Sequence, residues 1–104
     1  MKIRTLVIDD ESAFIGNLDS ILSNRSSPLE LVGDARSVEE GLKMIEELEP
    51  DLIFLDIQME DGTGFDLLER CERRDFRVIF VTAYDQYAID AFRFSAMDYL
   101  LKPV

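Results

Sequence analysis

IRTLVIDD, residues 3–10, is a short apolar run rich in branched side chains that ends in the acidic pair Asp9 and Asp10. A run of this kind, bounded by acidic residues, predicts a strand that is buried on both faces of a sheet. The sequence LIFLD at residues 52–56 repeats this design, because four apolar residues lead directly into Asp56. Two expected strands therefore carry acidic side chains at their carboxyl ends.

Strand and helix patterns alternate along the rest of the chain. Apolar residues at helical spacing predict a helix from Ser12 to about Asn24, and Ser37 with Glu40 predicts a capping box that opens the next helix. The remaining expected elements are strands 3–8, 29–35, 52–55, 78–81 and 99–101 and helices from Ser37 to Pro50, 65–73, and from the cap Asp85 to Ser95. The expected inner faces of the four helices are Phe14, Ile15, Leu18, Ile21 and Leu22; Val38, Leu42, Ile45 and Leu48; Leu67 and Leu68; and Ala88, Ala91 and Phe92.

This alternation predicts an α/β fold, a doubly wound parallel sheet with right-handed crossovers and helices on both faces. The 104 residues suffice for one domain with one core. In such sheets the ligand crevice lies beyond the carboxyl ends of the strands, where the strand order reverses. The polar residues at those ends are therefore the candidate site residues.

The composition excludes several classes of partner. With 22 acidic and 11 basic residues the formal charge is -11, which would repel a phosphate backbone, so we expect no nucleic acid binding by this fragment. The amino-terminal sequence becomes acidic before completing a signal-peptide apolar region, and no apolar run approaches the roughly 18 residues of a membrane span. We expect a cytoplasmic protein without membrane contact.

The chain contains no histidine, which excludes the usual catalytic triads, most zinc sites and the commonest general base. Cys71 is the single cysteine, so it cannot form an internal disulfide, and we expect a half-buried structural thiol. Any chemistry must therefore use carboxylates, hydroxyls and lysine.

Five polar residues follow or end the expected strands: Asp9, Asp10, Asp56, Thr82 and Lys102. Three carboxylates at one sheet edge repel one another unless a divalent cation or the lysine compensates. Ligation by oxygen alone suits octahedral Mg²⁺, which often accompanies a phosphoryl group. A carboxylate can itself be the nucleophile in phosphoryl transfer when Mg²⁺, Lys102 and the Thr82 hydroxyl neutralise the transferred oxygens. The spacing alone leaves Asp10 and Asp56 both as candidates for the nucleophile.

Four motifs, VIDDE, FLD, VTA and DYLLKP, together resemble the receiver domain of bacterial response regulators over the whole chain. The resemblance implies a flavodoxin-like (CheY-like) sheet with strand order 2-1-3-4-5. It also implies that Asp56 is the phosphoacceptor and that Asp9 and Asp10 bind Mg²⁺ together with Asp56 and the backbone carbonyl of Gln58. Lys102 is implied to pair with the phosphate.

The same resemblance implies a two-state switch. Phosphate draws the Thr82 hydroxyl inward, Tyr99 rotates into the vacated space, and the surface around the fourth helix changes its preferred partner. Gln58 and Tyr84 occupy the positions where receivers tune the lifetime of the phosphoaspartate. The implied donor is a sensor histidine kinase, and the implied role is a phosphoacceptor with self-catalysed transfer and autodephosphorylation, not an enzyme with an external substrate.

YDQYAIDAFRFSAMDYLLKPV, residues 84–104, resembles receivers attached to LytTR-type DNA-binding domains. This implies transcription regulation through an output domain that residues 1–104 do not contain, and a homodimer is a further candidate assembly. Glu60 stands where receivers usually carry proline, which affects the expected rigidity of the loop, whereas Gly64 matches the family's loop glycine. Residues 1–104 read as one receiver domain that stops before a fifth helix, so we expect an uncovered apolar strip beside the first helix.

Two other functions fit part of the pattern. A magnesium-dependent phosphohydrolase also uses an aspartyl nucleophile, but it usually needs a second acid two residues beyond, as a DxD pattern, and positions 11 and 58 are Glu and Gln. A receiver-like module that dimerises or docks without phosphorylation is the alternative from another class, although such modules commonly lose an acid or the lysine. Glu11 is expected to be a solvated residue of the first helical turn, outside the site.

Overall fold

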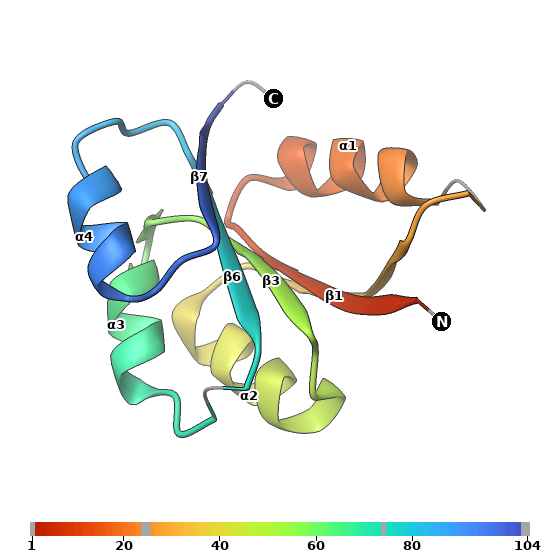
Figure 1. Ribbon diagram of the computed structural model, residues 1–104, viewed down its shortest axis with the longest axis horizontal. Coiled ribbons are helices and arrows are strands. Elements are labelled where there is room, and N and C mark those ends of the chain that lie inside the picture. Colours follow the sequence, from red (N-terminus) through yellow and green to blue (C-terminus); the bar gives the residue numbers. More distant parts are fainter. Residues whose placement is uncertain (1, 24–25, 74, 103–104) are drawn as a thin grey trace.

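Five parallel strands form the central sheet (Figure 1). The computed structural model describes residues 2–23, 26–73 and 75–102. The strands are β1 (Ile3–Ile8), β2 (Leu29–Ala35), β3 (Leu52–Leu55), β6 (Arg77–Thr82) and β7 (Asp98–Leu101). Their order is β2-β1-β3-β6-β7, which is 2-1-3-4-5 when the strands of this sheet alone are numbered along the chain. The predicted doubly wound sheet and its strand order are confirmed.

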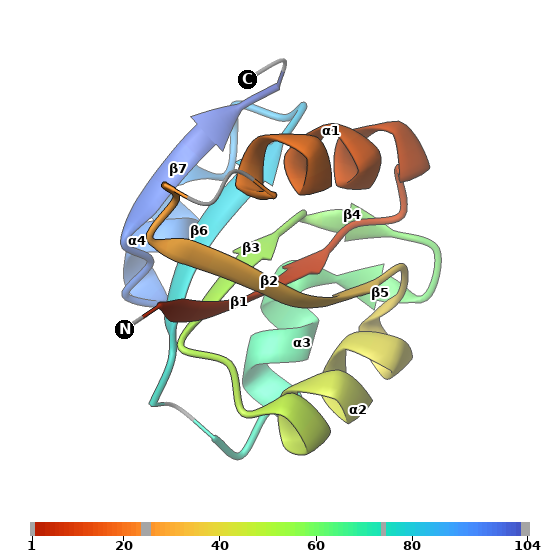
Figure 2. The ribbon, with the colours of Figure 1, turned by 90° about the vertical axis from the view of Figure 1, so that its right-hand side faces the viewer.

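One helix covers one face of the sheet and three cover the other (Figures 1 and 2). The helices are α1 (Ser12–Leu22), alone on its face, and α2 (Val38–Leu48), α3 (Gly64–Arg70) and α4 (Ala88–Arg93). Side chains of β1 alternate between the two layers: Leu6 and Ile8 belong to the core under α2, α3 and α4, whereas Val7 packs with residues of α1. Burial on both faces explains why the strands are apolar runs without polar alternation.

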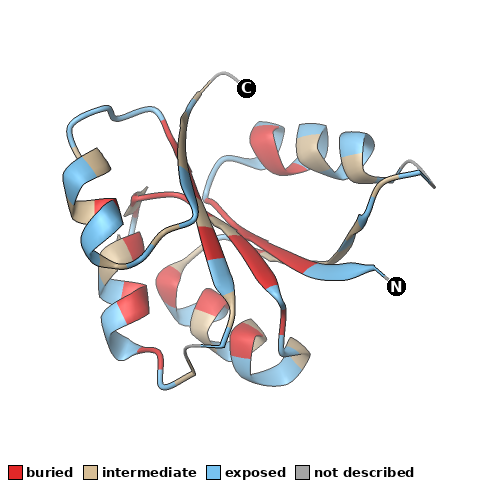
Figure 3. Cartoon of the chain, viewed as in Figure 1, coloured by how far each residue is buried: buried red, intermediate tan, exposed pale blue. Residues whose placement is uncertain are grey.

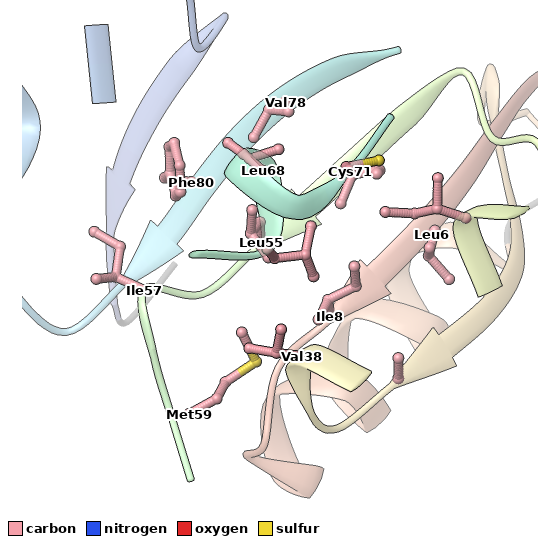
Figure 4. Packing of buried hydrophobic residues seen from close by; sticks show 14 of the residues in the cluster. Leu6, Ile8, Val38, Leu55, Ile57, Met59, Leu68, Cys71, Val78 and Phe80 are labelled. Atoms are coloured by element: carbon pink, nitrogen blue, oxygen red, sulfur yellow. The ribbon is translucent and has the colours of Figure 1, made fainter. Parts of the chain in front are cut away.

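The larger core lies between the sheet and the three helices (Figures 3 and 4). Ile53, Leu55 and Phe80 from the strands are fully buried there, as is Ile45 of α2. Cys71 is 6% exposed within this cluster, so the thiol is more deeply buried than predicted. This apolar layer holds β1, β3 and β6 in register and thereby fixes the relative positions of their carboxyl ends.

The face beneath α1 is covered less completely. Phe14 and Ile15 are buried as predicted, but Ile21 is 64% exposed, because it borders an open cavity. An open cavity of about 530 Å³ beside α1 is lined mainly by apolar side chains, which include Phe54 and Leu100. The cavity lies where the sequence predicted an uncovered apolar strip.

The fourth helix is shorter than predicted. It comprises Ala88–Arg93, with Tyr87 rather than Asp85 at the cap position, and it cannot continue to Ser95 because that residue has a left-handed φ of 60°. The expected inner position of Phe92 is also wrong, since this side chain is 65% exposed. Ala91 is the fully buried residue, and the next residue along a helix points about 100° away from it.

A short antiparallel hairpin occupies the segment that was predicted to be a loop. Its strands are β4 (Gln58–Met59) and β5 (Gly62–Thr63). α3 begins directly after it and ends at Arg70 instead of Arg73, because Cys71 has an extended backbone. The predicted end of α1 near Asn24 falls outside the described residues, and the helix itself ends at Leu22.

The amino termini of α2 and α3 are both capped. Ser37 Oγ accepts a hydrogen bond from Glu40 N at 3.1 Å, as predicted, but the Glu40 carboxylate accepts from Arg36 N instead of closing the box on Ser37. The complete capping box is at α3, where Thr63 and Asp66 exchange hydrogen bonds of 2.9 and 3.0 Å. The Thr-x-x-Asp spacing would have predicted this box from the sequence.

Across residues 2–23, 26–73 and 75–102, every helix is too short or too polar to span a bilayer. The longest helices have 11 residues, against the roughly 20 that a span requires.

Substitution of Gly64 tests how tightly α3 packs against the end of β3. A Cβ at this position would lie 2.5 Å from the backbone oxygen of Asp56, which cannot rotate away. We expect Gly64→Ala to lower the free energy of unfolding by about 1–3 kcal/mol in urea titrations. Gly16→Ala on α1 is the control: no described atom would lie within 4 Å of its Cβ, and helix propensity should raise stability by about 0.5–1 kcal/mol. Equal effects of the two substitutions would contradict the close approach.

Candidate functional site

The predicted site residues lie together at the carboxyl edge of the sheet. Asp9 follows β1, Asp56 follows β3, Thr82 ends β6 and Lys102 follows β7. Backbone hydrogen bonds extend the sheet past the strand ends, from Asp56 N to Ile8 O at 3.0 Å and from Lys102 N to Thr82 O at 2.9 Å. The sheet itself therefore aligns the functional side chains.

Three carboxylates form the acidic centre of the site. Asp9, Asp10 and Asp56 each offer one oxygen, and these three oxygens lie within 4.8 Å of one another. Asp9 is 1% exposed and Asp56 is 7% exposed, whereas Asp10 reaches solvent. Like charges at this separation repel one another strongly where water is excluded, so the cluster requires compensating positive charge.

Lys102 supplies part of that charge. Its Nζ lies 2.8 Å from Asp9 Oδ2 and 3.5 Å from Asp56 Oδ2, and it stands 4.8 Å above the centre of the Phe14 ring. Burial lowers the pKa of the ammonium, but the close contact with the Asp9 carboxylate and the charge of Asp56 outweigh burial, so the net pKa is raised. Lys102 therefore stays charged at neutral pH.

Glu11 also belongs to this charge cluster, contrary to its predicted place outside the site. Glu11 Oε1 lies 3.6 Å from Lys102 Nζ, and Glu11 N donates a hydrogen bond of 2.8 Å to Asp9 Oδ1. The Glu11 side chain is 55% exposed, so water screens its contribution. Apart from their closeness to Asp9 and Asp10 in the sequence, nothing in the sequence indicated that Glu11 and Phe14 contact Lys102.

The environment of Asp9 opposes ionisation. Burial raises the pKa of Asp9 from 3.8 to about 6, against the opposing effects of the nearby Lys102 ammonium and of the hydrogen bond from Glu11 N. Asp9 Oδ2 is fully buried and receives no hydrogen bond of acceptable geometry from any described residue, although the Lys102 ammonium is near it. An unsatisfied carboxylate oxygen among other acids is the arrangement that a bound cation would stabilise.

The carboxylate of Asp56 has a fixed orientation. Its Oδ1 accepts a hydrogen bond of 2.7 Å from Ile57 N, while Oδ2 faces Lys102. An open cavity of about 380 Å³ above Asp56 is lined by residues that include Asp10, Gln58, Tyr84 and Lys102. A small anionic group can therefore reach the carboxylate from solvent.

Thr82 and Tyr99 are both hydrogen-bonded to the backbone of one residue, Tyr84. Thr82 is fully buried, and its Oγ1 accepts a hydrogen bond of 3.3 Å from Tyr84 N. The carbonyl of the same residue, Tyr84, accepts a hydrogen bond from the Tyr99 hydroxyl. Burial raises the pKa of Tyr99, so this hydroxyl remains a donor at neutral pH. Two hydrogen bonds, both to the backbone of Tyr84, thus link Thr82 to Tyr99.

Gln58 begins β4 and makes a contact that the sequence did not predict. Its Nε2 donates a hydrogen bond of 3.0 Å to the hydroxyl of Tyr87, the cap residue of α4. The ring of Tyr87 packs edge-on against Tyr84, with 6.1 Å between the ring centres. The segment after Asp56 is therefore bonded to the start of α4.

The donor set fits a hard divalent cation. Three carboxylate oxygens converge, one buried carboxylate oxygen has the Lys102 ammonium near it but no hydrogen bond of acceptable geometry, and a cavity beside them is open to solvent. Oxygen ligands with several waters are what Mg²⁺ prefers. Asp9, Asp10 and Asp56, with the Gln58 backbone carbonyl, are the candidates to hold it.

Comparisons with known proteins agree with this geometry. The chain is 52% identical over 100 residues to an uncharacterized response regulatory protein of Vibrio parahaemolyticus, covering 95% of this chain and 41% of the relative. It is 39% identical over 103 residues to the sensory transduction protein LytT of Bacillus cereus, covering 97% and 42%. It is 40% identical over 104 residues to the transcriptional regulatory protein BtsR of Escherichia coli, covering 98% and 43%.

The chain thus spans about two fifths of the length of these relatives. Among solved structures, the response regulator domain of Thermotoga maritima CheB superimposes with a TM-score of 0.86 at 31% identity, covering 99% of this chain and 80% of that one. LytT and BtsR are regulators of the LytTR type, in agreement with the predicted group. Because the model of the response regulator receiver domain also matches residues 5–104, the chain belongs to the response regulator receiver family of two-component systems.

Proposed function

We propose that Asp56 is the phosphoacceptor of this receiver domain in a magnesium-dependent reaction. The observation that carries the proposal is the convergence of a buried, oriented Asp56 carboxylate with Asp9, Asp10 and Lys102, beside an open cavity that Asp10, Asp56 and Lys102 line. Receivers as a family are phosphoacceptors. Of the two nucleophiles that spacing left open, Asp56 is favoured because both of its oxygens have defined contacts.

Asp9, Asp10, Asp56 and the Gln58 backbone carbonyl would hold the metal. Bound Mg²⁺ supplies positive charge that offsets the carboxylates and the oxygens of the transferred group. Lys102, whose Nζ lies 3.5 Å from Asp56 Oδ2, would add a second positive charge, and the Thr82 hydroxyl would provide a neutral donor. The Asp56 carboxylate and the Lys102 ammonium already face each other before the phosphoryl group arrives, as electrostatic preorganisation requires.

In the proposed reaction an Asp56 oxygen forms a bond to phosphorus while the bond from phosphorus to the donor breaks. The products are an acyl phosphate on Asp56 and the donor with its electron pair restored. The chain has no histidine, so the donor is the phosphohistidine of a sensor kinase or a small phosphodonor. Hydrolysis of the acyl phosphate by water resets Asp56, so this protein acts as a phosphoacceptor with self-catalysed transfer and dephosphorylation.

Thr82, Tyr84 and Tyr99 form the proposed switch. When the Thr82 hydroxyl turns toward a phosphoryl group, it abandons its 3.3 Å hydrogen bond from Tyr84 N. The segment around Tyr84 then becomes free to move, and the Tyr99 hydroxyl loses its fixed acceptor. The consequence is a population shift in the loop that leads into α4.

The surface of α4 is the proposed output of this switch. Ile89 is 72% exposed and Phe92 is 65% exposed, and apolar surface of this kind commonly marks a protein contact. A homodimer or an output domain would cover it. We propose that the signal passes in the cytoplasm to a DNA-binding output domain outside residues 1–104. The name of BtsR, a transcriptional regulatory protein, supports a role in transcription.

Intact-mass measurement tests the phosphoacceptor directly. After incubation with acetyl phosphate and Mg²⁺ we expect the wild-type protein to gain the mass of one phosphoryl group. Asp56→Asn and wild-type protein in EDTA should gain none, because the first lacks the nucleophile and the second lacks the metal.

A folded wild-type protein that gains no mass would contradict the proposal and favour the phosphorylation-independent interaction module. Gain of a phosphoryl group by Asp56→Asn would instead move the acceptor to another residue.

Asp9 should make metal-free stability depend on pH. The pKa of Asp9 is about 6 in the folded state, above the ordinary 3.8, so between these pH values the folded state binds the proton more tightly than the unfolded state does. The free energy of unfolding therefore falls as the pH rises through 6. Asp9→Asn removes this loss, although Lys102 then keeps only Asp56 and Glu11 as charged partners. In EDTA we expect Asp9→Asn to raise the free energy of unfolding at pH 7.5 by up to about 3 kcal/mol and by less at pH 4.5.

Urea titrations at the two pH values measure this difference. Added Mg²⁺ should stabilise the wild-type protein at pH 7.5 and leave Asp9→Asn nearly unchanged. The explanation is wrong if Asp9→Asn destabilises the metal-free protein at pH 7.5.

Gln58 and Tyr84 should control the lifetime of the phosphoaspartate. Both line the cavity above Asp56, so they restrict the approach of water to phosphorus. We expect Gln58→Ala and Tyr84→Ala each to accelerate loss of the phosphoryl mass after the donor is removed. Ile89→Ala, on the exposed surface of α4, is the control and should keep the wild-type lifetime. Wild-type lifetimes in both cavity variants would rule out this role.

A further inference from the structure

The hairpin that follows Asp56 is tethered to the start of α2 by one side chain. Asp61, in the turn between β4 and β5, accepts a hydrogen bond of 2.8 Å from Val38 N and one of 3.0 Å from Glu39 N. These two residues begin α2, where backbone N–H groups have no acceptor within the helix. The contact therefore joins the hairpin to a separate element of the fold.

The electrostatics favour this tether. A carboxylate at a helix amino terminus interacts favourably with the helix dipole, and hydrogen bonds to a charged acceptor are stronger than neutral ones. The hydrogen bonds from Val38 and Glu39 hold the pKa of Asp61 below its ordinary value, so the carboxylate is charged at neutral pH. The Asp61 side chain lies at the surface, so burial does not strengthen the tether. The strength of the tether comes from the fixed directions of the two N–H groups.

The hairpin needs such a contact to have a defined conformation. Each of its strands has two residues, and an isolated hairpin of this size is not stable in water. Residue 60 is glutamate, so no proline restricts the turn. On the β5 side Thr63 and Asp66 hold the chain through the α3 capping box, whereas Asp61 holds the turn itself.

We propose that Asp61 is a positioning residue for the metal-binding loop. By tethering the β4–β5 turn to α2, it holds the Gln58 backbone beside Asp56 in the arrangement that binds Mg²⁺. This inference rests on the proposed function, because the Gln58 carbonyl matters to Mg²⁺ only if the metal binds there. Asp61 itself touches neither the metal nor the transferred phosphoryl group.

The magnesium dependence of phosphorylation tests this role. With acetyl phosphate as donor, we expect Asp61→Ala to raise the Mg²⁺ concentration for half-maximal phosphorylation about tenfold, as for other residues that orient a metal ligand. The rate at saturating Mg²⁺ should stay near the wild-type value, because the nucleophile and Lys102 are unchanged. Asp61→Asn, which keeps one acceptor oxygen, should shift the Mg²⁺ dependence less than Asp61→Ala.

Ser37→Ala is the matched control. Ser37 caps the same end of α2 through Glu40 N, so its loss weakens the helix terminus while leaving the Asp61 tether in place. We expect Ser37→Ala to keep the wild-type Mg²⁺ dependence. In metal-free protein, amide hydrogen exchange over residues 57–64 should accelerate in Asp61→Ala and not in Ser37→Ala.

Wild-type Mg²⁺ dependence in Asp61→Ala, or an equal shift in Ser37→Ala, would overturn the inference. A wild-type protein that takes no phosphoryl group in the same assay contradicts the proposed function instead. In that case the metal role of Asp61 fails with it, and the hydrogen exchange comparison still decides separately whether Asp61 orders the hairpin.

Discussion

The site depends on one constraint: the Lys102 ammonium must offset the two buried carboxylates of Asp9 and Asp56. Lys102 lies 2.8 Å from Asp9 and 3.5 Å from Asp56, and the Glu11 carboxylate adds further negative charge at 3.6 Å. One positive charge cannot balance this set, and burial, with a smaller contribution from the charge of Asp56, raises the pKa of Asp9 to about 6. A phosphoryl group, itself anionic, would be repelled by such a cluster, so in the proposed reaction cation binding must accompany its arrival.

The sheet maintains this unfavourable arrangement through apolar packing elsewhere. β1, β3 and β6 are buried on both faces, and backbone hydrogen bonds continue past their ends to Asp56 and Lys102. Burial of apolar side chains contributes about 25 cal/mol for each Å² removed from water, which can offset the cost of one poorly satisfied carboxylate. The acidic side chains are therefore held close together by the packing of the strands that carry them. They do not attract one another.

This separation of roles explains what the sequence could predict. The strands and the convergence of Asp9, Asp56 and Lys102 follow from local patterns: an apolar run sets each strand, and the next residue must lie at the sheet edge. The β4–β5 hairpin could not be found in this way, because the Asp61 tether joins residues 22 and 23 positions apart. Phe92 was misplaced because helical spacing shows which residues share a face but not which face meets the sheet.

Apolar packing in the core and hydrogen bonds in the polar loops also differ in how easily they rearrange. Apolar layers such as those around Phe80 are close-packed and resist small displacements. The segments that carry Gln58 and Tyr84 are instead held by a few directional hydrogen bonds, to Tyr87, Thr82 and Tyr99. Each such bond contributes only about 1 kcal/mol, so in the proposed switch a single new charge at Asp56 would be sufficient to exchange one set of hydrogen bonds for another. A rigid sheet with polar loops at its carboxyl edge can therefore keep the phosphoacceptor fixed while α4 changes position.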